Sequence, residues 1–170
     1  MNGPPKLTPY DEISLAIGKL TIRWSMVESG WHLIFLSLYG IEKGGGSISM
    51  TSVNALYHSH RSFAGQRRMV FSYAKAILGD DPRLTRLGQL SQATEKLAGM
   101  RNAVQHASFM FMGPSPGDLR LGISPLNPSK KLADKDIVDE IAGLIPEVNE
   151  LIGNLGLWAT KLRGISGALR

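Results

Sequence analysis

The most constraining feature of the sequence is a long, regular apolar pattern near its start. Apolar side chains recur there at alternating steps of four and three residues, at Ile13, Ile17, Leu20, Trp24, Val27, Trp31, Ile34 and Leu38. Such spacing is typical of a long α-helix that packs lengthwise against another helix. Thr8 and Pro9 suit the start of this helix, and Gly40 suits its end. About thirty residues of helix rise roughly 45 Å, so the sequence predicts an elongated helical bundle.

Helical periodicity returns in three later segments. One is expected at residues 51–78, with a weak point at 62–65, and another at residues 83–107. Asp134 suits the start of the last helix, and Pro146 should kink that helix. The sequence therefore predicts four principal helices, and the first of them is long for a domain of this size.

The segment before the last helix has a different composition. Residues 112–131 combine four prolines with three glycines, which is incompatible with a helix. Within this insertion, residues 119–123 could form a short strand or one arm of a hairpin. The sequence shows neither an internal repeat nor a domain boundary. Residues 1–170 are therefore predicted to form a single all-α domain, with four principal helices and one irregular Pro/Gly-rich insertion.

The composition is that of an ordinary globular protein, with 43% hydrophobic and 19% charged residues. The chain has no cysteine, which excludes disulfides and thiolate metal sites. The first residues contain no apolar segment behind a basic start, so we expect no secretory signal. The longest apolar run, Trp31 to Tyr39, is too short to span a bilayer. These observations favour a soluble, cytoplasmic protein with no membrane partner.

The residues with the clearest chemical meaning lie near the end of the third predicted helix. They are Arg101, Asn102, Ala103, Val104, Gln105 and His106. Arg101 lies on or beside the apolar face, where a guanidinium needs either a route to solvent or an acceptor. Five residues turn the side-chain direction by about 140°, so Arg101 and His106 cannot point the same way from one regular helix. Either the helix ends before His106, or the working pair combines side chains from two subunits.

The string Arg-Asn-x-x-x-His, following a long amphipathic helix, resembles the signature of the HEPN superfamily (higher eukaryotes and prokaryotes nucleotide-binding). The resemblance covers about residues 10–163 loosely, and its specific part is residues 101–106. It implies an up-and-down four-helix bundle, usually dimerised so that two copies of the motif face each other. Many members are metal-independent endoribonucleases of toxin–antitoxin, phage-defence and RNA-processing systems.

The chemistry of such an enzyme suits these residue types. RNA cleavage without a metal needs a base for the 2′-OH proton, an acid for the leaving 5′-oxygen and cationic donors for the phosphorane. The resemblance implies that His106 is the acid/base group and Arg101 the phosphate clamp, while Asn102 orients the phosphate or the imidazole. It also implies RNA as the substrate, a second copy of the chain as a partner, an antitoxin protein as a candidate partner, and no metal or other cofactor.

A structural interpretation of the same residues stays open. Arg101 can pair with Glu28 or Glu95, and His106 can cap the helix end, where a positive charge is favourable. In the functional interpretation Glu28, at the edge of the apolar face of the first helix, is the acceptor that holds Arg101 or His106 in place. The alternative function is a non-catalytic HEPN-like module that binds a nucleotide, RNA or a protein.

A second candidate surface is basic and contains aromatic residues. The net charge of +5 permits binding to polyanions such as RNA. Arg61, Arg68 and Lys75 repeat every seven residues, and Arg67 lies beside them. Four aromatic residues are interleaved with these cations, namely Tyr57, Phe63, Phe71 and Tyr73. Such a face can follow an RNA backbone and stack bases, whereas the alternative is a solvated charged face over an ordinary core.

Three other patterns do not support a function. His58 and His60 diverge from a helix and have no carboxylate at a ligand spacing, so no metal site is expected. The run of glycines at residues 44–46 is not followed by the Gly-Lys-Ser/Thr of a phosphate-binding loop. Ser72 and Ser115 occur in strings that resemble those of serine hydrolases, but without the required flanking structure or companion motifs.

Overall fold

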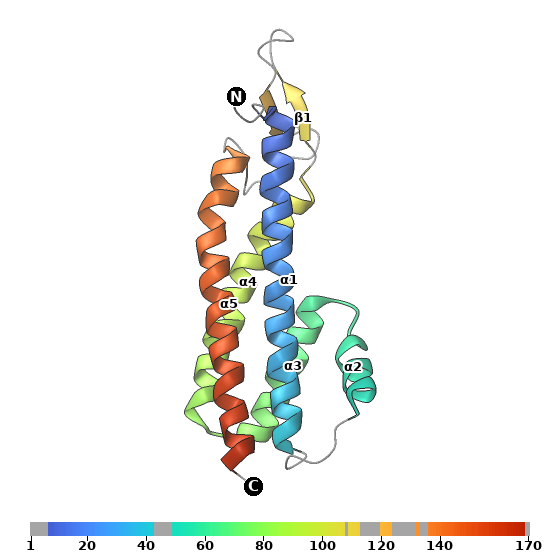
Figure 1. Ribbon diagram of the computed structural model, residues 1–170, viewed down its shortest axis with the longest axis vertical. Coiled ribbons are helices and arrows are strands. Elements are labelled where there is room, and N and C mark those ends of the chain that lie inside the picture. Colours follow the sequence, from blue (N-terminus) through green and yellow to red (C-terminus); the bar gives the residue numbers. More distant parts are fainter. Residues whose placement is uncertain are drawn as a thin grey trace, which may run out of the picture. The chain divides into compact units, whose positions relative to one another are not determined.

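The computed structural model describes residues 7–42, 49–107, 109–112, 120–123, 132 and 136–168. Within these ranges the chain is predominantly helical, with five helices and two short strands (Figure 1). In chain order the elements are α1 (Pro9–Glu42), α2 (Met50–His58), α3 (Phe63–Leu78), α4 (Pro82–Gln105), β1 (Phe109–Met112), β2 (Arg120–Ile123) and α5 (Ile137–Ala168). The predominance of helix confirms the sequence-based prediction, while the number of helices differs from it.

The long first helix is present and is slightly longer than predicted. Thr8 and Asp11 cap it reciprocally: the backbone N–H of Asp11 donates to the Thr8 hydroxyl at 3.2 Å, and the N–H of Thr8 donates to the Asp11 carboxylate at 3.0 Å. The Thr8 hydroxyl also donates to the Asp11 carboxylate at 2.6 Å, and this hydrogen bond, together with the one from the Thr8 N–H, lowers the pKa of Asp11. The helix does not stop at Gly40, as predicted, but continues to Glu42, whose carboxylate accepts a hydrogen bond from Tyr73. A tertiary contact therefore holds the last turn.

The second predicted helix is two helices, because the chain breaks between α2 and α3. Ser62 has an extended backbone, with φ −120° and ψ 145°, and its hydroxyl accepts a hydrogen bond from the N–H of Gly65 at 3.1 Å. This is an N-cap, which begins a new helix at Phe63. The weak point that the sequence indicated at residues 62–65 is therefore a complete interruption.

The insertion before the last helix contributes a β-hairpin. β1 and β2 pair antiparallel, with Phe109 opposite Ile123 and Met112 opposite Arg120. The strand expected at residues 119–123 is present as β2, and apart from this hairpin the described elements are all helices. Residues 113–119 and 124–131, which make up the rest of the insertion, lie outside the described residues.

The last helix begins three residues later than predicted. Its first residue is Ile137, and the carboxylate of Asp136 accepts hydrogen bonds from the N–H groups of Val138 and Asp139 at 2.8 and 3.1 Å. Asp134, the predicted start, lies outside the described residues. The helix continues through Pro146.

The contacts of the chain group its residues into two compact units. The first unit comprises Met1–Arg23 and Leu97–Glu147, and the second comprises Trp24–Lys96 and Val148–Arg170. Each has its own buried apolar residues. Those of the first unit include Ile13, Leu20, Leu97, Val104, Ile137 and Ile141, and those of the second include Trp24, Trp31, Phe35, Leu38, Val70, Leu87, Leu155 and Leu162. The prediction of one domain over residues 1–170 stays a prediction.

Two contacts show how tightly the second unit is packed. The indole N–H of Trp31 donates to the hydroxyl of Thr94 at 3.1 Å, and both side chains are buried. A Cβ atom added to Gly30 would lie 3.0 Å from the Cβ of Leu155, so α1 and α5 approach closely at this glycine. Among the described helices, none is long and apolar enough to cross a membrane.

Candidate functional site

The Arg-Asn-x-x-x-His residues lie at the C-terminal end of α4, in the first unit. Leu97 and Val104 are 4% and 1% exposed, so they direct this part of the helix toward the core of the unit. The helix ends at Gln105, and His106 is the first residue after it. The N–H of His106 still donates to the carbonyl of Asn102 at 3.0 Å. His106 is therefore held at the helix end without being part of the regular helix.

The end of α4 bears on the first of the two arrangements that the sequence left open for Arg101 and His106. One required the helix to end before His106, and the structure has this arrangement. The direction of the His106 side chain is consequently not set by the geometry of a regular helix. The second arrangement, in which two subunits supply the working pair, involves a partner chain and stays a prediction.

Arg101 and Asn102 form a pair of polar side chains. Nη1 of Arg101 donates to Oδ1 of Asn102 at 3.0 Å. Arg101 is half-buried, and its Nε atom is buried, whereas Asn102 and His106 are exposed. One side of the Arg101 guanidinium is therefore buried, whereas the amide of Asn102 and the imidazole of His106 are exposed to solvent. This arrangement can present hydrogen-bond donors and a titratable ring to an anionic molecule.

A further residue of the motif segment connects α4 to α1 within the first unit. Nε2 of Gln105 donates to the hydroxyl of Thr21 at 3.5 Å, and this hydroxyl donates to the carbonyl of Ile17 at 2.9 Å. The last turn of α4 is therefore positioned beside the first half of α1. Sequence reasoning placed Gln105 in the motif segment but did not link it to Thr21, because nothing in a single sequence connects residues 84 positions apart.

Glu28 and Glu95 were the acceptors that the sequence offered to Arg101. Both belong to the second unit, whereas Arg101 belongs to the first. Glu28 is half-buried on α1, and its predicted role as a supporting acceptor stays a prediction. Glu95 lies 3.2 Å from Nη2 of Arg67 and forms an ion pair with it. Glu95, which the sequence offered as an ion-pair partner for Arg101, is therefore paired with Arg67 instead.

The predicted basic face is smaller than the sequence indicated. Arg61 lies in the break between α2 and α3, so it does not continue the heptad spacing of a helix. Arg67 is buried, and its Nη1 donates to the hydroxyl of Ser91 at 2.8 Å and to the carbonyl of the same residue. Arg68 and Lys75 are exposed on α3 and keep the seven-residue spacing. Two of the four predicted RNA-contacting cations therefore share an exposed helix face.

Two of the four aromatic residues near these cations, Tyr57 and Phe63, pack against other rings of the second unit. Tyr57 is 2% exposed, and its ring lies 5.6 Å from that of Phe35. Phe63 packs edge-on against Trp24, with ring centroids 5.8 Å apart. Base stacking on these two rings would require α2 or α3 to move, so Tyr57 and Phe63 do not provide the stacking platform that the sequence suggested.

No metal-binding cluster is present among the described residues, because no three of their His, Asp and Glu side chains gather at one place. His58 lies against the ring of His32, with centroids 5.7 Å apart, and His60 lies in the break after α2. The two histidines of the His-Ser-His string therefore have separate surroundings.

No protein-family model matches the chain, and neither a curated protein nor a solved structure is significantly similar to it. Its function must therefore be inferred from the chemistry of its own residues. The end of α4 is the place in the first unit where an arginine, an amide and an imidazole occur within six residues.

Proposed function

We propose that the protein is a metal-independent endoribonuclease of the HEPN type, which acts on RNA in the cytoplasm as part of a toxin–antitoxin or phage-defence system. One observation carries the proposal. α4 ends at Gln105, and the exposed His106 follows directly after a helix that carries the paired Arg101 and Asn102. Three groups suited to phosphoryl transfer are thus available at one helix end.

In the proposed reaction an imidazole accepts the proton of a ribose 2′-OH. The 2′-oxygen then attacks the neighbouring phosphorus, the bond to the 5′-oxygen breaks, and this oxygen takes a proton from an acid. The products are a 2′,3′-cyclic phosphate and a 5′-OH end. Arg101 binds the phosphate oxygens and offsets the charge of the phosphorane, because its planar guanidinium fits two oxygens at once. Asn102 orients the guanidinium through its 3.0 Å hydrogen bond.

The reaction needs both a base and an acid, and each chain contributes one His106. We therefore propose a homodimer in which two copies of the motif face each other. Exposed apolar side chains in the first unit support this part: Leu15 and Ile22 are 48% and 65% exposed and lie seven residues apart on α1. A second copy that packed on this face would remove them from water. In the proposal, α1, α3, α4 and α5 form the up-and-down bundle of the family.

The proposal is tested by incubating a mixed RNA pool with the purified protein in EDTA. We expect cleavage with 2′,3′-cyclic phosphate ends by the wild type and none by His106→Ala. His60→Ala is the matched control, because it removes an exposed histidine outside the motif and should leave cleavage unchanged. An equally folded wild type that cleaves no RNA would overturn the proposal and favour a non-catalytic HEPN-like module that binds a nucleotide, RNA or a protein.

A further inference from the structure

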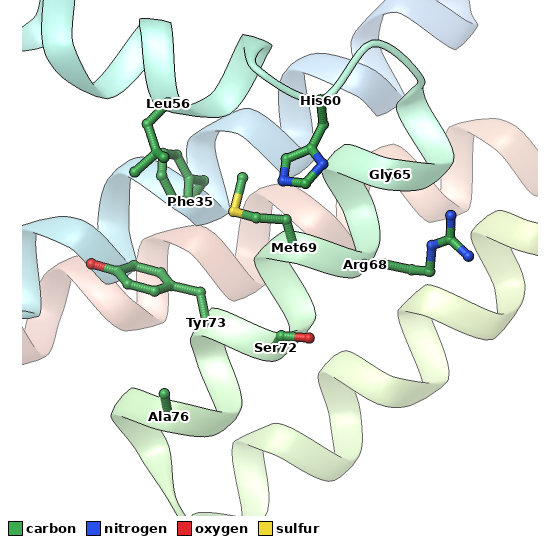
Figure 2. Close-up of a pocket in the computed structure, with 9 residues that line it drawn as sticks. All are labelled: Phe35, Leu56, His60, Gly65, Arg68, Met69, Ser72, Tyr73 and Ala76. Carbon is green, nitrogen blue, oxygen red and sulfur yellow. The ribbon is translucent and has the colours of Figure 1, made fainter.

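The second unit contains a groove that the proposed nuclease does not use. Its volume is about 630 Å³, and Figure 2 shows the side chains that line it. They come from α1, α2, α3 and the break between α2 and α3, and none belongs to residues 101–106. The lining residues are Phe35, Leu56, His60, Gly65, Arg68, Met69, Ser72, Tyr73 and Ala76.

One part of the groove is apolar. Met69, Tyr73 and Ala76 lie four and three residues apart and so share one face of α3. Phe35 forms the floor: it is fully buried, and its ring lies 5.5 Å from that of Tyr73. Leu56 of α2 is 47% exposed and lines the same groove. The groove therefore offers a preformed apolar wall that is still in contact with water.

The other part of the groove is polar and cationic. Arg68 and Ser72 are exposed, lie four residues apart on α3, and extend away from Phe35 and Leu56 in Figure 2. The ring of His60 points toward Met69, between the two parts. Neither of the two ion pairs among the described residues involves Arg68. A guanidinium, a hydroxyl and an imidazole are thus available at one side of an apolar surface.

The position of His60 is set by the start of α3. A Cβ atom added to Gly65 would lie 3.5 Å from the Cβ of His60 and 3.2 Å from the hydroxyl of Ser62. Because Gly65 has no side chain, the histidine packs directly against the first turn of α3. The Ser62 cap fixes the path of the chain here, so the imidazole is positioned by local structure.

We infer that this groove binds a small amphiphilic anion, with the apolar body against Leu56, Met69 and Tyr73 and the anionic head at Arg68, Ser72 and His60. The size of the groove supports a small molecule, because pockets for such ligands typically occupy about 300–1,000 Å³. The separation of apolar and cationic residues supports an amphiphile, because each part of the ligand then meets a matching surface. This inference does not depend on the proposed nuclease.

The test is a titration of the full chain with decanoate, followed by backbone NMR chemical shifts. Decanol, which has the same apolar chain without the charge, is the matched ligand. We expect saturable shifts in α2 and α3 and a weaker response to decanol. Arg68→Gln should weaken decanoate binding about tenfold and leave the response to decanol unchanged. Leu56→Ser should weaken both ligands, because the apolar wall serves both.

Lys75→Gln is the control variant for Arg68→Gln. It removes the same charge from an exposed position of α3, one heptad away and outside the groove, and should change the affinity less than twofold. Equal losses in the two variants would show general attraction to a basic surface and overturn the inference. A wild type that gives no saturable response, or shifts that are spread evenly over the chain, would also overturn it. The same titration of His106→Ala should give the wild-type response, because the groove does not depend on the proposed nuclease site.

Discussion

Arg67 and Glu95 join α3 to α4 in the second unit: Nη2 of Arg67 lies 3.2 Å from the carboxylate of Glu95. The arginine side chain is 8% exposed, whereas the glutamate side chain is 73% exposed. Ser91 accepts two further hydrogen bonds from the same guanidinium. The cation is therefore satisfied chiefly by groups of α4 that lie next to the core, and it is part of the packing between the two helices.

These contacts predict unequal effects of removing the two partners. Arg67→Ala should lower the free energy of unfolding by about 2–4 kcal/mol, because it removes a buried side chain and leaves the acceptors of Ser91 unpaired. Glu95→Gln should cost less than about 1 kcal/mol, because an exposed carboxylate gains little from one ion pair. Urea denaturation measures both values. Equal and small losses would contradict the structural role of Arg67.

A second prediction concerns Asn102, whose Oδ1 accepts a 3.0 Å hydrogen bond from Arg101. If the proposed function is correct, Asn102→Ala should reduce kcat for RNA cleavage about 10- to 100-fold, because Arg101 loses the group that orients it. The melting temperature should change little, since Asn102 is exposed. Gln92→Ala, at another exposed position of α4, is the control. A fall in melting temperature that accounts for the lost activity would indicate a structural role instead.

The third prediction concerns the loss of folding stability at acidic pH. Burial lowers the pKa of His32 below its ordinary value of 6.5; the nearby His58 lowers it further, and Asn54 opposes part of the shift. The unfolded chain therefore takes up a proton at this residue at a higher pH than the native protein does. Stability that is fully present above pH 6.5 should be lost as the pH falls from there toward the lower native pKa.

The His32→Phe variant isolates this effect. It keeps an aromatic ring against Tyr57, whose centroid lies 4.5 Å from that of His32, and removes the titrating group. We expect the variant to lose less stability than the wild type between about pH 7 and about pH 5, as measured by urea denaturation at each pH. Identical slopes in wild type and His32→Phe would refute the prediction.

The fourth prediction tests the proposed homodimer. Ile22 is 65% exposed on α1, so Ile22→Glu should fold normally as a single chain. A carboxylate at a buried dimer interface is strongly unfavourable, and the variant should therefore be monomeric and inactive toward RNA. Leu157→Glu is the control, because Leu157 is 64% exposed on α5 and should tolerate the charge. Light scattering after size exclusion distinguishes the two states, and a monomeric wild type would end this part of the proposal.

The sequence predicted α1 well because its spacing permits few alternatives. Leu20, Trp24, Val27 and Trp31 are all buried, as the alternating steps of four and three require. The break before α3 was harder to predict, because helical periodicity continues on both sides of it. It is decided by the extended backbone of Ser62 and by its capping hydroxyl, which the periodicity of apolar residues does not register.

The hairpin and the groove depend on contacts between distant parts of the chain. Residues 109–112 are all apolar, so their pattern alone does not distinguish a strand from a buried helical turn, and their pairing with residues 120–123 decides the matter. In the same way the sequence pointed to Arg68 as part of a charged face, but its place on a groove that Phe35 also lines required the packing of α1 on α3. Periodicity describes one element at a time, which is why the sequence indicated one strand of the hairpin but neither its partner nor the groove.

The last prediction concerns Gly30, at the close approach of α1 and α5. A Cβ atom there would lie 3.0 Å from the Cβ of the buried Leu155, which cannot rotate aside because it is attached directly to the backbone of α5. Gly30→Ala should therefore destabilise the protein by about 1–3 kcal/mol, although alanine favours a helix over glycine by about 1 kcal/mol. Gly153→Ala is the matched control, since no atom lies within 4 Å of its added Cβ, and it should stabilise the protein slightly. Thermal and urea denaturation of the two variants should give shifts of opposite sign, and stabilisation by both would mean that the helices are not in close contact at Gly30.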